Sequence, residues 1–106
     1  MSFLKIGNVS DFPEGAAVAV RVGARRIAVY RVDDEFFAIK NICPHEANPL
    51  HNAPPDGGAA VCRAHGWRFD LRTGQCLRGD RDSRVAVYPV KIDGDEVLVN
   101  FDRGSS

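Results

Sequence analysis

The chain has no long apolar run and no excess of charge of either sign. Its apolar stretches are far shorter than the roughly 18 residues that a membrane-spanning helix needs, so we expect no membrane span. The opening residues lack the basic and apolar regions of a signal peptide, which predicts a cytoplasmic protein. The 14 basic and 14 acidic residues cancel to a formal charge of zero, which argues against nucleic acid as the main partner.

Cysteine is scarce as well, with three residues in a chain of 106. Cys43 and Cys62 each have a histidine close by in sequence, whereas Cys76 is left over. If Cys43 and Cys62 bind a metal, only one cysteine is left, so we expect no disulfide pair; a reducing cytoplasm also suits metal ligation better than disulfides. The length predicts a single domain over residues 1–106, with a modest core to which a bound metal centre would add folding energy.

Apolar residues alternate with smaller or polar ones in the N-terminal third, which is typical of antiparallel strands. The alternation runs through residues 18–22, breaks at Gly23, where we expect a turn, and resumes at 27–29. A second turn at Asp33-Asp34 precedes a third strand over 35–39. These strands would form a meander that leads directly to the first cysteine.

The C-terminal third returns to the same alternation. Val90 and Ile92 precede the turn Asp93-Gly94-Asp95, and alternation resumes over residues 97–101, which together predict a β-hairpin. Shorter strands are expected in the middle of the chain, at 59–62, 67–71 and 76–77. Because no stretch has a convincing helical period, we expect an all-β fold.

Two short clips, each with one cysteine and one histidine, flank a long loop. The first is Cys43-Pro44-His45, and the second, Cys62-Arg63-Ala64-His65-Gly66, begins after 16 intervening residues (46–61). Two thiolates and two imidazoles form a complete donor set for a buried metal centre. A zinc site remains an alternative for these donors, but Cys-x-His paired with Cys-x-x-His fits a Rieske [2Fe–2S] cluster better.

With the continuation Gly66-Trp67-Arg68-Phe69-Asp70, the clips resemble the two cluster-binding boxes of Rieske proteins. The short chain is similar to the Rieske-type ferredoxins of bacterial aromatic-ring dioxygenase systems, and the resemblance covers nearly its whole length. It implies antiparallel sheets in a sandwich-like base, with a cluster-binding subdomain inserted at about residues 43–70.

The resemblance also implies the cofactor and its ligands. One [2Fe–2S] cluster would be held by Cys43 and Cys62 on one iron and by His45 and His65 on the other. Two Fe³⁺, two sulfides and two thiolates sum to zero charge, against about −2 for an all-cysteine cluster, and the less negative centre accepts an electron more readily. No residue is assigned a catalytic role.

The implied function is that of a soluble, monomeric one-electron carrier. By resemblance it would take electrons from a flavin-containing reductase and pass them to a terminal oxygenase. The chain cannot be the oxygenase itself, because a mononuclear iron site needs two histidines and a carboxylate, and only His51 remains after the cluster ligands are assigned.

Two functions from other classes stay open. The small subunit of an assimilatory nitrite reductase would keep the cluster, but such an obligate subunit should expose a large apolar patch, of which the charge-balanced strands give no sign. A metal-stabilised binding module would do no redox work, and a colourless, zinc-loaded protein would identify it.

Respiratory Rieske proteins differ from this chain in two ways. They carry an extra cysteine in each clip, joined as a disulfide, and a serine and a tyrosine whose hydroxyls donate to the cluster sulfurs. Here the clips have no extra cysteine, and Trp67 and Phe69 stand at the hydroxyl positions. Because fewer donors stabilise the reduced state less, we expect a potential of about −150 mV rather than +300 mV.

Several residues outside the ligand set carry further expectations. His51 is expected to be a solvated loop histidine, and Cys76 a half-buried strand residue. Trp67 would either pack beneath the cluster loops or join a docking surface. That surface, at the cluster tip, is expected to comprise Pro44, Pro49, Leu50 and Trp67. A solvated face or docking patch is expected of the arginines 63, 68, 72, 78, 81 and 84.

Overall fold

The computed structural model describes residues 3–44, 48–64, 66–80 and 82–101. In these residues the chain forms antiparallel strands and one short 3₁₀ helix, η1 (Val9–Asp11), which confirms the all-β expectation. The strands are β1 (Leu4–Asn8), β2 (Ala17–Val22), β3 (Arg25–Val32), β4 (Glu35–Lys40), β5 (Ala59–Val61), β6 (Arg68–Asp70), β7 (Cys76–Arg78), β8 (Val87–Tyr88), β9 (Val90–Asp93) and β10 (Glu96–Val99). In the described part of the chain, no helix is long and apolar enough to cross a membrane.

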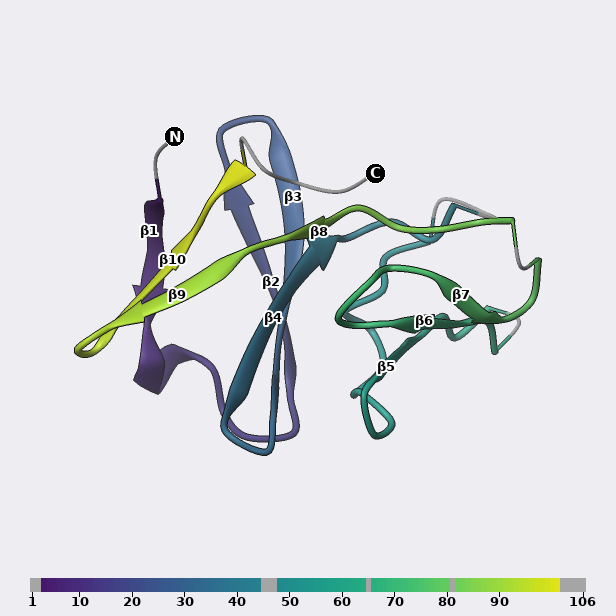
Figure 1. The fold of residues 1–106 in the computed structure, drawn as a ribbon, viewed down its shortest axis with the longest axis horizontal. Coiled ribbons are helices and arrows are strands. Elements are labelled where there is room, and N and C mark those ends of the chain that lie inside the picture. Colours follow the sequence, from purple (N-terminus) through teal and green to yellow (C-terminus); the bar gives the residue numbers. More distant parts are fainter. Residues whose placement is uncertain (1–2, 45–47, 65, 81, 102–106) are drawn as a thin grey trace.

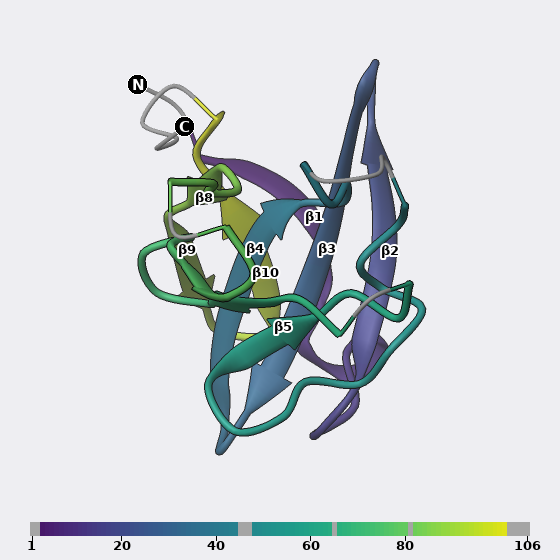
Figure 2. The same ribbon diagram turned by 90° about the vertical axis from the view of Figure 1, so that its right-hand side faces the viewer.

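The strands form three sheets, of order β1-β10-β9, β2-β3-β4-β8 and β5-β6-β7 (Figure 1). We call the first two sheets the base and β5-β6-β7 the small sheet. One apolar core lies between the two sheets of the base, and a second joins the four-stranded sheet to the small sheet and its loops. Figure 2, viewed from the side of the small sheet, shows β5 in front of β3 and β4.

Strand β3 separates the two cores. Ile27 and Val29 belong to the core within the base, whereas Ala28 and Tyr30 belong to the core under the small sheet. All four side chains are completely buried. The alternation in sequence predicted a strand with one buried face, but β3 is buried on both faces because the small sheet covers the second one.

The expected meander and hairpin are confirmed. The turn between β3 and β4 places Asp33 and Asp34 at φ values of 52° and 65°, in the left-handed region that aspartate tolerates better than most residues. Their N–H groups donate to the carboxylate of Glu14, at 2.7 and 2.8 Å, which holds the turn in place. The β9–β10 hairpin closes with Asp93 paired to Glu96.

Two strands were not expected. β1 pairs with β10, with an irregularity in register between Lys5 and Gly7, and β8 is only two residues long and pairs with β4. The small sheet extends past residue 70, because β7 pairs with β6 and the N–H of Val85 donates to the carbonyl of Gly74 at 2.8 Å.

Candidate metal centre

The two cysteines of the clips lie in one buried group of side chains. Cys43 follows the end of β4 and Cys62 follows the end of β5; both are 0% exposed and both belong to the core under the small sheet. Burial of two thiol groups in one core fits a shared soft metal centre. The expected ligands His45 and His65 lie outside the described residues. Among the described residues no group of three potential ligands converges.

The loop after Cys43 is tied to the base by Asn41. The Asn41 side chain, 7% exposed, accepts hydrogen bonds through Oδ1 from the backbone N–H groups of Leu50, at 2.8 Å, and His51, at 3.0 Å. Its Nδ2 lies 2.8 Å from Nδ1 of His51. Across the first clip, the N–H of Cys43 donates to the carbonyl of Asn48 at 2.7 Å. These hydrogen bonds therefore tie the described ends of the loop to each other and to the base.

His51 is not the solvated loop histidine that the sequence suggested. It is partly buried and its ring is hydrogen-bonded to Asn41. The sequence could not reveal this hydrogen bond, because Asn41 directly follows β4 and lies ten residues before His51 in the chain.

The second clip is closed by its own backbone. The N–H of Cys62 donates to the carbonyl of Trp67, and the N–H of Gly66 donates to the carbonyl of Cys62, both at 2.8 Å. Gly66 has φ +71°, a conformation that glycine adopts without the strain that a side chain would bring. The turn of the second clip therefore favours glycine at position 66.

Tyr30 supports the first loop from beneath. Its hydroxyl donates to the carbonyl of Leu50 at 3.1 Å, and both side chains are completely buried. Burial raises the pKa of the Tyr30 phenol, so the proton needed for this hydrogen bond is retained. The expectation that Leu50 belongs to an exposed tip is wrong, because its side chain packs inward; Pro44 and Pro49 are exposed.

Trp67 has a packing role. It is partly buried against the core under the small sheet and lies near Phe69, with ring centroids 6.5 Å apart. Gly79, at φ +128°, lies against the indole so closely that a Cβ there would come within 2.3 Å of a ring atom. The structure thus supports the packing interpretation, while leaving part of the ring accessible.

Cys76 is more buried than expected, at 2% exposure in β7. Its Sγ lies 3.2 Å from the carbonyl oxygen of Arg78. The three cysteines, all of them within the described residues, form no disulfide, as expected.

Two of the arginines expected to form a solvated face or docking patch pair with acids that are distant in sequence. Arg72 makes a two-pronged contact with Glu35, at 2.6 and 2.7 Å, and Arg68 binds Asp56 at 2.7 Å. The hydrogen bond from Arg72 lowers the pKa of the Glu35 carboxyl. Two further arginines of this set donate to backbone carbonyls: Arg63 to Asn52 and Arg84 to Thr73. Arg81 lies outside the described residues.

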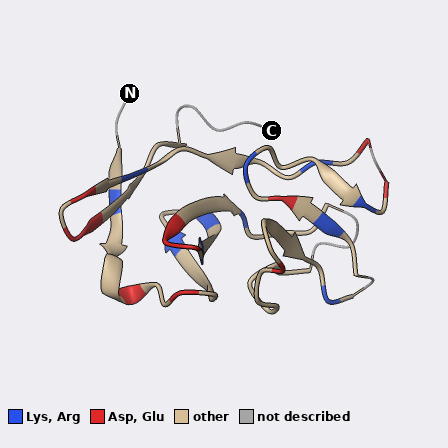
Figure 3. Cartoon of the chain, turned by 60° about the horizontal axis from the view of Figure 1, so that its bottom comes forward, with Lys and Arg blue, Asp and Glu red and all other residues tan. Residues whose placement is uncertain are grey.

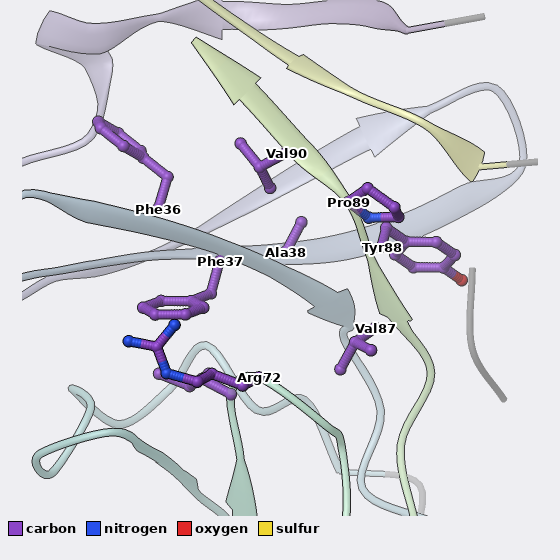
Figure 4. Close-up of a pocket in the computed structure, with 9 residues that line it drawn as sticks. Phe36, Phe37, Ala38, Arg72, Val87, Tyr88, Pro89 and Val90 are labelled. Atoms are coloured by element: carbon purple, nitrogen blue, oxygen red, sulfur yellow. The ribbon is translucent and has the colours of Figure 1, made fainter. Parts of the chain in front are cut away.

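A cavity of about 280 Å³ lies where the small sheet meets the base. Figure 4 shows its lining, in which the Arg72 guanidinium lies against the Phe37 ring, 5.2 Å from the ring centroid. Its walls come from β4, β8 and β9 together with Leu71 and Arg72, and neither Cys43 nor Cys62 lines it. The cavity is therefore a feature of the junction between the small sheet and the base.

Comparisons with known proteins agree with this arrangement. Residues 2–89 match the family described as the Rieske [2Fe-2S] domain. The biphenyl dioxygenase ferredoxin subunit of Pseudomonas sp. (strain KKS102) is 35% identical over 99% of this chain and 97% of its own length. The ferredoxin of carbazole 1,9a-dioxygenase from Nocardioides aromaticivorans IC177 superposes with a TM-score of 0.86 at 28% identity, over 93% of this chain and 97% of that chain.

Two further structures bear on possible partners. A complex of reduced oxygenase and oxidised ferredoxin in carbazole 1,9a-dioxygenase contains a chain 35% identical to this one, with a TM-score of 0.83 and coverage of 92% and 91%. A nitrite reductase small subunit from Mycobacterium tuberculosis has a TM-score of 0.83 over 99% of this chain and 96% of its own, but at 20% identity the likeness concerns the fold alone. The chain therefore belongs to the Rieske [2Fe-2S] domain family, and its curated relatives are ferredoxin components of dioxygenase systems.

Proposed function

We propose that the protein is a one-electron carrier that takes electrons from a flavin-containing reductase and passes them to the terminal oxygenase of an aromatic-ring dioxygenase system. The observation that carries the proposal is end-to-end similarity to a dioxygenase ferredoxin subunit, with Cys43 and Cys62 buried together at the two clips. The nitrite reductase alternative has only a shared fold in its favour. The proposal includes a single domain over residues 1–106, a monomeric state and a cytoplasmic location.

We further propose that one [2Fe–2S] cluster is held by Cys43 and Cys62 through their thiolates and by His45 and His65 through their imidazoles. When bound, such a cluster accepts and releases a single electron. The described residues would serve it by excluding water, because Leu50 and Phe69 are completely buried in the same core as both cysteines.

The first experiment tests the cluster. Purified protein is assayed for iron and acid-labile sulfide, and its visible and electron paramagnetic resonance spectra are recorded before and after reduction. We expect two irons and two sulfides per chain, a Rieske-type spectrum and uptake of one electron. Zinc in place of iron would instead support a binding module.

The second experiment tests the carrier role and the potential. Reductase and oxygenase of a biphenyl dioxygenase system are mixed with the protein, and transfer through it is followed with NADH as the electron source. We expect oxygenase turnover to depend on the added protein, and its potential to lie at about −150 mV. A potential well above 0 mV would contradict the argument from Trp67 and Phe69.

A further inference from the structure

Four basic residues gather at one end of the four-stranded sheet. Arg21 lies near the end of β2, Arg25 and Arg26 begin β3, and Lys40 ends β4; we call these four residues the cationic end. All four are exposed, and Arg21 of β2 stands directly opposite Arg26 of β3 in the paired strands. Within the described residues, none of them forms an ion pair. Elsewhere Lys5, Arg31, Arg68 and Arg72 each pair with an acid.

The opposite end of the same sheet is acidic. Glu14, Asp33, Asp34 and Glu35 gather at the β3–β4 turn, where Arg31 and Arg72 neutralise part of their charge. In Figure 1 the β2–β3 turn is at the top of the sheet and the β3–β4 turn at the bottom. Figure 3 shows further acidic segments at the β9–β10 turn, at the edge of the molecule away from the small sheet. The formal charge of zero therefore hides a separation of charge along the four-stranded sheet, with cations at one end and acids at the other.

The cationic end is continuous with the first metal loop. One surface hollow, of about 310 Å³, is lined by Arg21 and Arg26 together with Ile42, Pro49 and His51. A second hollow, of about 480 Å³, shares Arg26 and Ile42 with the first and adds the side chains of Arg25, Lys40 and Tyr88. Ile42 directly precedes Cys43, and the N–H of Asn41 donates to the carbonyl of Arg26 at 3.0 Å. A partner seated on the cationic end would therefore lie beside the loop that carries Cys43.

We infer that the cationic end is the docking surface for an acidic face of the terminal oxygenase, an inference that rests on the proposed function. Cations that pair with no acid in the described part of the chain, and that lie beside an electron-transfer site, attract a partner of opposite charge and orient it before contact. The oxygenase is the partner we choose because a ferredoxin chain 35% identical to this one forms a direct complex with an oxygenase. The contact would be brief, as redox encounters are, so charge would act mainly on the association rate.

The test compares two charge-reversed variants with the same net charge. Arg26→Glu with Lys40→Glu alters the cationic end, whereas Lys5→Glu with Lys91→Glu alters β1 and β9, on the other sheet of the base. Each is loaded with cluster, checked by its spectrum and iron content, reduced, and mixed with oxidised oxygenase in a stopped-flow instrument at low and high salt. Reduction of each protein by the reductase is measured in parallel.

For the cationic-end variant we expect the second-order rate constant with oxygenase to fall at least about tenfold at low salt and the difference to shrink at high salt. The β1/β9 variant should stay within about twofold of the unaltered protein, and the reductase step should change little for either. Equal slowing by both variants, no slowing, or slowing confined to the reductase step would overturn the inference. If the unaltered protein passes no electron to the oxygenase at any salt, the proposed function itself fails.

Discussion

The longest strand of the base, β3, spans eight residues, whereas each strand of the small sheet spans three. The base is held by an apolar core in which side chains such as Val97 and Val99 are completely buried. The small sheet shares a second apolar core with the base, and it also has clips closed by backbone hydrogen bonds at the two cysteines. Hydrophobic burial stabilises long regular strands well, but short strands between loops need additional ties, such as metal ligands.

The two regions are nevertheless coupled, because the face of β3 and β4 that carries Tyr30 and Ile39 forms part of the core under the small sheet. A change can thus affect the small sheet alone, one core, or the junction between regions. Four tests separate these cases, in order of decreasing effect.

Removing a proposed ligand should have the largest effect and should be confined to the small sheet. In Cys62→Ala we expect loss of the visible spectrum and much faster amide hydrogen exchange in β5, β6 and β7, with β3 and β10 still protected. Cys76→Ala, also buried in this region, is the control and should keep its cluster. Retention of a normal spectrum by Cys62→Ala would exclude this residue as a ligand.

Matched phenylalanines distinguish the two cores. Phe69 is buried in the core under the small sheet, and Phe12 is buried in the core within the base. The Phe12 ring lies edge-on to the Phe36 ring, with the ring centroids 6.3 Å apart. Each Phe→Ala substitution should lower the free energy of unfolding by about 3–5 kcal/mol. Only Phe69→Ala should also speed the loss of iron, measured by the decay of visible absorbance. Equally fast loss of iron from Phe12→Ala would mean that the two cores are not independent in holding the cluster.

Tyr30→Phe tests a single hydrogen bond between the regions. Loss of the bond to the Leu50 carbonyl should cost about 1 kcal/mol in denaturant unfolding. Burial raises the pKa of the phenol in the folded state, so both states keep the proton below about pH 10. Above that pH the unfolded state loses its proton first, and stability falls by up to about 1.4 kcal/mol per pH unit. The Phe variant has no phenol proton to lose, so its stability should fall less steeply above that pH. An identical slope of stability against pH in both proteins would contradict this prediction.

The smallest effect is expected at the exposed pair that joins β4 to the segment after β6. Arg72 lowers the pKa of the Glu35 carboxyl, chiefly by hydrogen bonding, so its stabilising contribution is present above the unfolded pKa and is lost as pH falls through the folded value. In Arg72→Met the Glu35 pKa should rise, as followed by carboxyl carbon NMR shifts. In Arg72→Lys, which keeps the charge but loses the two-pronged contact, the Glu35 pKa should lie between its values in the unaltered protein and in the Met variant. An unchanged pKa in the Met variant would refute the pairing.

Sequence patterns predicted the long strands and the hairpin, because alternation and turn residues are local signals. They missed β1, an edge strand whose Leu4 is 46% exposed and whose pairing is irregular, and β8, which is too short to show a period. β3 is buried on both faces because the small sheet, which is formed by residues much later in the chain, covers its second face. Local patterns cannot show which distant segment will cover a strand.

The candidate site was predicted to a similar degree. The clip spacing predicts Cys43 and Cys62 as ligands, since ligand motifs are compact in sequence; both cysteines are buried, and their ligand role stays a prediction. The surroundings were predicted less well. Leu50 was placed on the surface because it lies in a polar loop, yet it packs over Tyr30. The acids that pair with Arg68 and Arg72 come from 12 and 37 residues earlier in the chain.

Asn41 has a consequence for the cost of ordering the loop that follows Cys43. Its amide oxygen holds the backbone of residues 50 and 51 against the end of β4. Ordering a loop costs conformational entropy, and these hydrogen bonds offset part of that cost with groups of the base. The far part of this loop is therefore held by the folded base through protein hydrogen bonds.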